Sequence, residues 1–402
     1  MENNYYVLKN LDFEEKKIFN LLQKKGKLSE SQISLLTNIK ITTLKSLMHS
    51  LEKNKIIVKK CIGESTGGRK PKLYDIDLNE FYIIGIDISI MYTQMVITNL
   101  KMEILYKDIF YMDSACTSDE TVKRIVEIIN KAYENLKLNS TKLLGVGLAT
   151  VGPLDIENGI IKNPTNFYAP KWSNIPIRSM LEEKLNCHVT IENGANAAAV
   201  AEYLYGIGKG IENIAYFNHG IGIRTGTISS GSLLRMINDE EEVFGHMIIE
   251  ANGKQCKCGS IGCIESYSSI KSIIEIISDK IKRGRHTIIN KSVKDINYKD
   301  ICLAAEKDDD LAKEILTDSA LMLGIGLANY IKLLNPKLVI LSGPLIIESK
   351  LFYDVCINNA LKNLHSTKGK GVIFNRCGYF KENAMSVGAA AMVIERCLDS
   401  KI

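Results

Sequence analysis

Apolar residues recur at helical spacing near the start of the chain. The pattern predicts helices over residues 13–25 and 41–53, with a shorter helix between them. Ser29 and Gln32 form a capping box that marks the start of this middle helix. The third helix has one apolar face and one polar face. Its polar face carries the side chains that we expect to contact DNA: Thr42, Thr43, Lys45, Ser46 and His49.

A strand pattern, a glycine-rich basic loop and a second strand pattern follow over residues 56–77. Three helices and a hairpin predict a winged helix-turn-helix domain over residues 1–78, with the third helix in the major groove of DNA. Arg69, Lys70 and Lys72 lie at the tip of the wing, where they would contact phosphates or a narrow minor groove. The alternative is a three-helix module that binds another protein.

Beyond this head the spacing of apolar residues changes from the pattern of a helix to that of a strand. Three strands are predicted within residues 81–111, and a similar triplet recurs within residues 213–235, each followed by helices. The repeat predicts two similar α/β lobes around a cleft. We place this body at residues 79–402, with lobe one at about 79–197 plus the C-terminal helix and lobe two at about 198–384.

Charge is unevenly distributed along the 402 residues. Residues 1–75 carry 15 Lys and Arg against 8 Asp and Glu, a balance of +7, whereas the whole chain is +5 and the remainder therefore −2. A basic head on a near-neutral body favours double-stranded DNA as the partner of the head.

The apolar segments are too short for a membrane protein. The chain has no run of about eighteen apolar residues and no basic-then-apolar start, so we expect a cytoplasmic protein with no membrane segment. Its ten cysteines follow no disulfide framework, which favours reduced thiols.

Four soft ligands lie within one stretch of eighteen residues: His246, Cys256, Cys258 and Cys263. Three thiolates and one imidazole make a closed tetrahedral set, which is typical of a structural zinc ion. Glycines between the cysteines allow the sharp turns that bring the sulfurs together. The alternative is a cluster of ordinary reduced thiols.

Four segments together resemble the ROK family of repressors, open reading frames and kinases. They are G-H at 245–246, C-K-C-G-S-I-G-C-I-E at 256–265, G-V-G-L-A-T-V-G-P at 145–153 and I-E-N-G-A-N-A-A-A at 191–199. The head, with S-T-G-G-R-K-P, is similar to the repressor branch, which includes regulators that respond to xylose, N-acetylglucosamine and glucose. The resemblance implies a winged head followed by two actin-like, ribonuclease-H-like lobes.

The positions that the family's kinases use for catalysis are altered. Gly194 stands where the resemblance implies the carboxylate base that accepts the proton of the sugar hydroxyl. Ser89 and Ile90 replace glycines of the first phosphate loop, Arg224 replaces a glycine of the second, and residues 342–344 read Ser-Gly-Pro in the third. We therefore expect no catalytic residue, no functional ATP site and no enzyme activity.

The resemblance also implies an effector site on the body. Asn193, His246 and Glu265 match sugar contacts of the family, whereas Gly194 and Val243 replace two carboxylates that would accept hydrogen bonds from hydroxyls. We expect these three matching residues to contact a sugar or sugar-derivative effector.

The sequence thus predicts a transcriptional regulator of carbohydrate-related genes, a repressor of the xylose-repressor-like type. A homodimer or higher homo-oligomer would place two third helices on two half-sites of an operator. Two alternatives remain open. One is a ROK sugar kinase with a fused DNA-binding head, and the other is a regulator controlled by a protein partner with no sugar effector.

Overall fold

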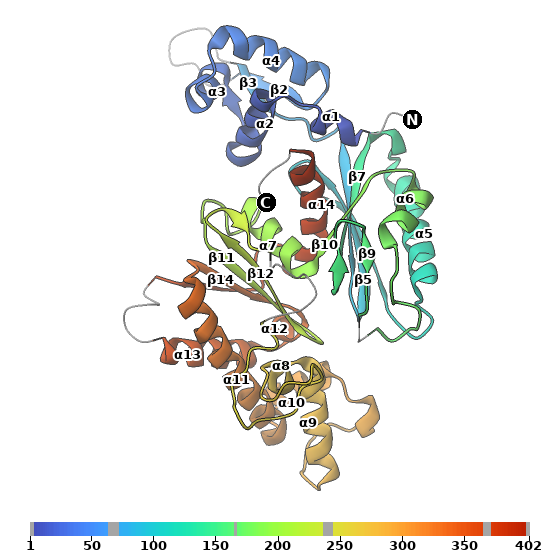
Figure 1. Cartoon of the computed structure of the whole chain (residues 1–402), viewed down its shortest axis with the longest axis vertical. Coiled ribbons are helices and arrows are strands. Elements are labelled where there is room, and N and C mark those ends of the chain that lie inside the picture. The colour runs from blue at the N-terminus through green and yellow to red at the C-terminus, as the bar shows by residue number, and fades with distance from the viewer. Residues whose placement is uncertain (1–3, 63–71, 165–166, 236–243, 365–370, 399–402) are drawn as a thin grey trace. The chain divides into compact units, whose positions relative to one another are not determined.

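The computed structural model describes residues 4–62, 72–164, 167–235, 244–364 and 371–398 (Figure 1). The chain divides into two compact units. The first contains residues 1–197 together with 385–402, and the second contains residues 198–384.

A winged helix-turn-helix head opens the first unit. Its three-stranded sheet has the order β1-β3-β2, with antiparallel neighbours. A short additional helix, α1, precedes the three predicted helices (Figure 1). The elements of the head are α1 (Tyr5–Lys9), α2 (Phe13–Lys25), β1 (Leu28–Ser29), α3 (Glu30–Thr37), α4 (Ile41–Lys53), β2 (Ile57–Ile62) and β3 (Lys72–Ile76).

The local sequence explains where the head's helices begin. The Ser29 hydroxyl accepts the backbone N–H of Gln32, and the Gln32 side chain accepts the N–H of Ser29, so the predicted capping box is confirmed. Lys40 provides no side-chain cap for α4. Packing holds α4 instead, because Leu44, Met48 and Leu51 on its inner face are buried.

The lobe-one sheet of the first unit has the order β10-β7-β4-β5-β6. Helices α5 and α6 cover one face, and α14 lies against the other (Figure 1). The bounds are β4 (Tyr82–Ile88), β5 (Tyr92–Asn99), β6 (Ile104–Tyr111), α5 (Ser118–Leu136), η1 (Ser140–Lys142), β7 (Leu143–Thr150), β8 (Leu154–Asp155), β9 (Ile160–Ile161), α6 (Ile177–Leu185), β10 (Val189–Asn193), α7 (Gly194–Leu204, which crosses into the second unit) and α14 (Ala384–Cys397).

Two glycines explain how closely α14 approaches this sheet. Gly85 of β4 and Gly147 of β7 are register partners on neighbouring strands. A Cβ atom on either would overlap the backbone of Ser386 or Ala389 in α14. The small residues of α14 therefore pack directly on bare backbone.

The sheet of the second unit repeats the same plan, with the order β13-β12-β11-β14-β15. In both sheets, strands one to three are antiparallel neighbours, strand four pairs in parallel with strand one, and strand five pairs in parallel with strand four. The predicted internal repeat and two-lobed actin-like fold are confirmed. The strands are β11 (Ile214–His219), β12 (Ile223–Ser229), β13 (Ser232–Leu233), β14 (Leu338–Ser342) and β15 (Ile373–Arg376).

Helices form most of the rest of the second unit. They are α8 (Glu265–Ser268), α9 (Ile270–Lys282), η2 (Val293–Asp295), α10 (Tyr298–Glu306), α11 (Asp310–Leu334), α12 (Pro344–Glu348), α13 (Lys350–Asn363) and η3 (Lys381–Asn383). Among the described residues, no helix combines the length and apolar character that crossing a bilayer requires.

Candidate functional site

The predicted metal ligands lie on the loop of residues 244–264, which precedes α8 in the second unit and which we call the metal loop. The N–H groups of Glu265 and Ile264 donate to the carbonyls of Gly245 and Met247, at 2.9 and 3.0 Å. A bridge between Ile248 and Cys263 continues this pairing. His246, ten residues before the first cysteine, is thereby held beside Cys263.

Aromatic packing anchors the start of the same loop. Phe244 is buried, and its ring lies 4.8 Å from that of Phe217 in β11 and 5.5 Å from that of Tyr330 in α11. The loop therefore has a fixed base in the core of the second unit.

A tight turn brings the three sulfurs together. The N–H of Cys256 donates to the carbonyl of Ser260 at 2.8 Å, and the N–H of Gly259 donates back to Cys256 at 3.0 Å. Gly262 has a φ of +79°, and a Cβ atom there would overlap the carbonyl of Glu250. The glycine is needed for both the backbone angle and the close approach.

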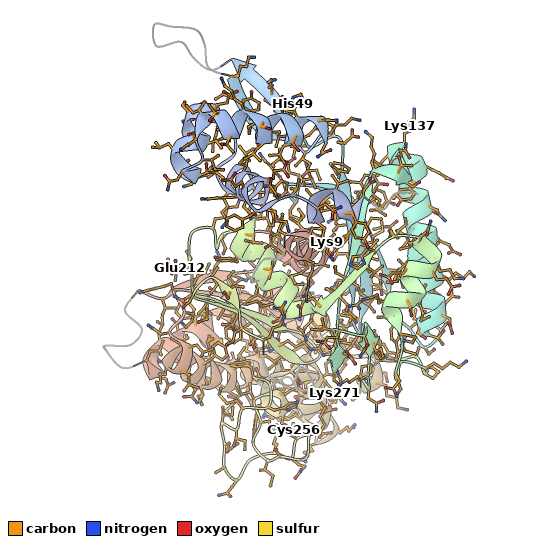
Figure 2. The ribbon with its side chains drawn as sticks, turned by 45° about the horizontal axis from the view of Figure 1, so that its top comes forward. Lys9, His49, Lys137, Glu212, Cys256 and Lys271 are labelled. Carbon is orange, nitrogen blue, oxygen red and sulfur yellow. The ribbon has the colours of Figure 1, made fainter. Side chains whose placement is uncertain are left out.

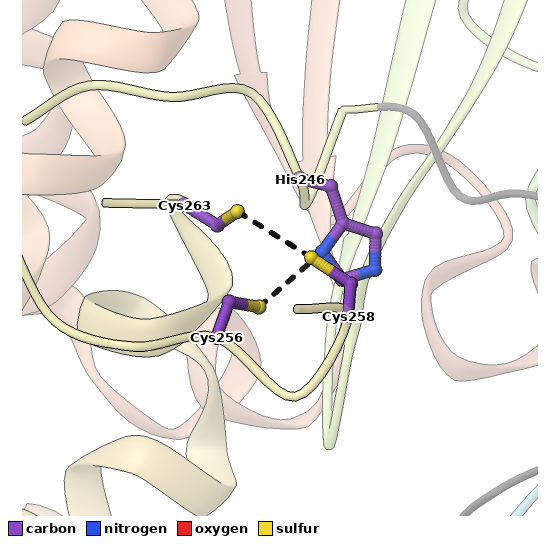
Figure 3. A group of neighbouring side chains, drawn as sticks. All are labelled: His246, Cys256, Cys258 and Cys263. Carbon is purple, nitrogen blue, oxygen red and sulfur yellow. Dashed lines mark hydrogen bonds between the residues drawn. The ribbon is translucent and has the colours of Figure 1, made fainter. Parts of the chain in front are cut away.

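The four candidate ligand side chains point toward one another (Figure 3). Their ligand atoms all lie within 4.8 Å of one another. The Cys258 and Cys263 sulfurs are 3.7 Å apart, and the Cys256 sulfur is 3.5 Å from Nδ1 of His246. A zinc–sulfur bond of about 2.3 Å implies tetrahedral S–S edges of about 3.8 Å. The residues therefore fit a tetrahedral metal ion.

The thiols strongly affect one another's ionisation. Burial, followed by hydrogen bonds with Cys258 and Cys256, raises the pKa of Cys263 to about 12. Burial alone would also raise the pKa of Cys258, but the N–H of Ser260 and the neighbouring thiols lower it overall. Three adjacent thiolates need a compensating cation, which a bound metal ion would supply.

Glu265, a predicted effector contact, lies directly beside the metal loop and is almost fully buried. Its Oε1 is 2.9 Å from the ammonium of Lys257, and its Oε2 accepts the N–H of Ile223 at 3.2 Å. Lys257 lies between two of the predicted metal-ligating cysteines, Cys256 and Cys258, and was not predicted as a site residue. Its sequence signal is the basic residue within C-K-C, but only the fold shows its partner.

A cavity of about 410 Å³ adjoins this ion pair. Polar and charged side chains from the metal loop, from the α8–α9 junction and from α9 line most of its wall, including Lys254, Lys257, Glu265, Ser269 and Ser272. Ammonium, carboxylate and hydroxyl groups of this kind can exchange hydrogen bonds with the hydroxyl groups of a small ligand.

His246 can serve the metal and a ligand at once. Its Nδ1 faces the sulfur of Cys256. The other ring nitrogen, Nε2, remains for a hydrogen bond outside the metal cluster, because the two nitrogens of imidazole point away from each other.

Asn193, the third predicted effector contact, belongs to the first unit at the end of β10. Its Oδ1 accepts the N–H of Ala195 at 2.9 Å and so caps α7. The neighbouring Gly194 is buried, and a Cβ atom added there would lie 3.1 Å from the sulfur of Met385. The amide oxygen of Asn193 is therefore already used by the fold.

The altered phosphate loops are closely packed. Ile90, which stands at a glycine position of the first loop, is buried. Arg224 is half-buried in β12, opposite Asn218 of β11. In the third loop, a Cβ atom on Gly343 would meet the backbone of His219.

His219 ends β11 at the second glycine loop and is completely enclosed. Its ring packs 4.9 Å from that of Phe352, and its Nε2 lies 3.5 Å from the hydroxyl of Ser268. Its Nδ1 has no hydrogen-bond partner within the part of the chain that the structure describes. Burial lowers the pKa of His219 to about 4, so the imidazole is neutral near pH 7.

The predicted DNA contacts on α4 form one exposed face. Thr42, Thr43, Lys45, Ser46 and His49 are all exposed, and Figure 2 marks His49 on this helix. Lys72 is exposed at the start of β3. The other two wing residues, Arg69 and Lys70, lie outside the described residues, as does Val243 of the body.

Similar proteins include both regulators and kinases. The chain is 27% identical to a xylose repressor of Caldicellulosiruptor bescii, over 92% of both chains. It is 28% identical to a xylose repressor of Bacillus subtilis, over 96% of both. A solved ROK family transcriptional regulator, homologous to the E. coli MLC protein, superposes with a TM-score of 0.79 at 20% identity, covering 98% of this chain and 97% of that one.

Kinases match the body of the chain. A ROK family glucokinase from Streptomyces griseus, solved with glucose and AMPPNP, has a TM-score of 0.67 and 25% identity. It covers 77% of this chain, and 98% of the glucokinase is matched. The sequence pattern described as the ROK family matches residues 83–396. This match spans most of the chain, which therefore belongs to the ROK family.

Proposed function

We propose that this protein is a cytoplasmic, DNA-binding transcriptional repressor of carbohydrate-related genes. The observation that carries the proposal is the exposed polar face of α4 in a winged helix-turn-helix head. Side chains of this kind read base edges in the major groove when the second helix of the motif docks there. The similarity to xylose repressors supports the same function, because it extends over 92% or more of the chain.

The metal cluster would hold a structural zinc ion through His246, Cys256, Cys258 and Cys263. Zinc is favoured because it prefers four-coordinate sites with thiolate and imidazole ligands. With all four positions filled by protein, these residues would hold the ion in a structural role, and the ordered loop would present Lys257 to Glu265. The ion would have no role in a reaction.

The effector would be a sugar or sugar derivative, and Glu265 and Nε2 of His246 would contact it in the second unit. The expected contact at Asn193 of the first unit stays a prediction from the resemblance. A homodimer, or a higher homo-oligomer, would present two heads to an operator with two half-sites. Effector binding would then act by favouring one arrangement of the heads over another.

We further propose that the body has no kinase activity. A general base contributes about two to four orders of magnitude in rate, and Gly194 offers no group that can accept a proton. Gly194 also lies against the Met385 side chain, which fills the space next to it. Incubation with ATP and a panel of pentoses and hexoses tests this, and turnover above a protein-free blank would overturn it.

DNA binding can be tested with no operator chosen in advance. Duplexes selected by the protein from a random-sequence pool define a binding site, whose affinity fluorescence anisotropy then measures. Thr43→Ala/Lys45→Ala should weaken binding at least about tenfold, since a good base contact contributes about 1–3 kcal/mol. Lys24→Ala removes an equal charge from an exposed position on α2 and serves as the control. Equal losses in the two variants would count against recognition by α4.

A further inference from the structure

The turn between β5 and β6 in the first lobe is unusually well covered. Turns at the end of a sheet normally face solvent. Here Leu100 and Met102 are 0% and 2% exposed, although neither belongs to the apolar core that the sheet forms with α5 and α6. The carbonyl of Leu100 accepts the side-chain amide of Gln23 at 2.6 Å. Since Gln23 lies on α2, the head covers this turn.

An ion pair joins the same turn to the wing sheet. Nζ of Lys101 lies 2.5 Å from Oδ1 of Asp75 in β3. Asp75 is 4% exposed, and its carboxylate also accepts the N–H of Ile76 at 2.8 Å. A carboxylate this deeply buried requires a charged partner, because an unpaired charge there would lose its hydration without compensation.

A second charged group bridges the head and the lobe at the end of α4. Glu80 accepts a hydrogen bond from Lys55 at 2.9 Å and lies 3.0 Å from the ammonium of Lys142. Lys55 follows α4 by two residues, whereas Lys142 belongs to η1 of the lobe. The end of the proposed recognition helix is thereby connected to the first lobe.

The N-terminal helix α1 provides a third attachment. The Tyr5 ring packs 4.0 Å from that of His188, which directly precedes β10, and the sulfur of Cys397 in α14 contacts the Tyr5 carbonyl. Tyr5 is 5% exposed. Helix α1 leads within four residues into α2, so both chain ends of the head are fastened to the lobe.

From these contacts we propose that Lys101 and Asp75 form a positioning pair that seats the DNA-binding head rigidly on the first lobe. The inference rests on the proposed function and deepens it. With the heads fixed on their lobes, the body of the protein sets the distance between two recognition helices. Affinity should then depend steeply on half-site spacing, because a seated head gains no contact from a displaced half-site.

The variants Lys101→Met, Lys101→Arg and the charge swap Lys101→Asp/Asp75→Lys test the pair. Lys123→Met, which removes a solvent-exposed ammonium on α5 of the same lobe, is the matched control. Affinity is measured on the selected duplex and on the same duplex with half a helical turn, about five base pairs, inserted between its half-sites.

We expect Lys101→Met to lose about tenfold in affinity on the unaltered duplex and to show a smaller penalty for the insertion than wild type. Lys101→Arg and the charge swap should recover both properties, which a general loss of stability would not allow. Wild-type behaviour of Lys101→Met, or a swap that recovers neither property, would overturn the proposal.

Amide hydrogen exchange tests the attachment of the head to the first lobe without any DNA. In the full-length protein, Lys101→Met should accelerate exchange at least about tenfold in β3 and in residues 99–103, and leave β7 unchanged. Unchanged exchange at both segments would refute the attachment of the head through Lys101 and Asp75. If the wild-type protein selects no DNA sequence while exchange in these segments accelerates in Lys101→Met, the proposed function is wrong but the attachment of the head to the first lobe is supported.

Discussion

The metal loop and the phosphate loops of this chain differ in what they retain of the family pattern. His246, Cys256, Cys258 and Cys263 are all present, and the fold brings their ligand atoms within 4.8 Å of one another. The catalytic position carries Gly194, and Ile90 and Arg224 occupy glycine positions of the phosphate loops. The four predicted metal ligands are present, while other residues stand where the family resemblance implies catalytic and phosphate-binding groups. This difference is what we expect of a kinase fold used for regulation.

Removal of the metal should have the largest effect. Cys263→Ser, or a strong chelator, should destabilise the second unit by more than about 4 kcal/mol, because loss of a structural metal also removes the ordering of its loop. Thermal unfolding and elemental analysis measure stability and zinc content. Cys377→Ser, at a half-buried cysteine outside the cluster, is the control. A wild-type protein with far less than one zinc per chain would contradict the tetrahedral assignment.

Acid should destabilise the second unit through His219. Its folded-state pKa of about 4 lies below the ordinary value of 6.5, so the unfolded state binds the extra proton between these values. This contribution leaves stability unchanged above pH 6.5 and reduces it by up to about 3 kcal/mol as the pH falls to 4.

Denaturant unfolding of wild type and His219→Gln at pH 7.5 and pH 4 measures the contribution of His219 to the pH dependence of stability. The free energy of unfolding should fall less steeply with acid in the variant. Equal decreases would show that burial does not keep His219 neutral.

Loss of Lys257 should destabilise the protein less, because the Lys257 side chain is 39% exposed and Glu265 keeps its hydrogen bond from the N–H of Ile223. We expect Lys257→Met to lower the free energy of unfolding by about 1–3 kcal/mol. A double-mutant cycle with Glu265→Gln should give a coupling of at least about 0.5 kcal/mol. Strictly additive losses would mean that the ion pair does not connect the metal loop to the ligand site.

Gly194→Asp should have the smallest effect. The new Cβ would lie 3.1 Å from the flexible Met385 side chain, which can move by the few tenths of an ångström required. The variant should fold and still show no sugar phosphorylation in a coupled ATPase assay, because the phosphate loops remain altered. Measurable turnover would show that a single residue separates regulator from kinase.

Local chemistry made much of this molecule predictable. The helix at 41–53 and the capping box of Ser29 follow from spacing and side-chain type within a few residues. The family resemblance and the internal repeat correctly indicated two similar actin-like lobes. The cluster of His246, Cys256, Cys258 and Cys263 could be proposed from sequence because soft side chains at short separations carry a signal of their own, and the fold brings their ligand atoms together.

Other features depend on contacts between distant segments. Helix α1 has five residues, too few for an amphipathic pattern, and it is stabilised by packing on His188. The pairing of Asp75 with Lys101, and that of Lys257 with Glu265, joins residues that sequence alone does not bring together. The use of Asn193 as a cap of α7 likewise became visible only in the fold.

Anisotropy of the full-length protein on a self-selected duplex, against a scrambled duplex at the same salt, tests the central claim most directly. A repressor of this kind should prefer the selected duplex by about three orders of magnitude or more, and Thr43→Ala/Lys45→Ala should reduce that preference. Equal affinity for both duplexes, together with phosphorylation of a sugar by ATP, would contradict the account.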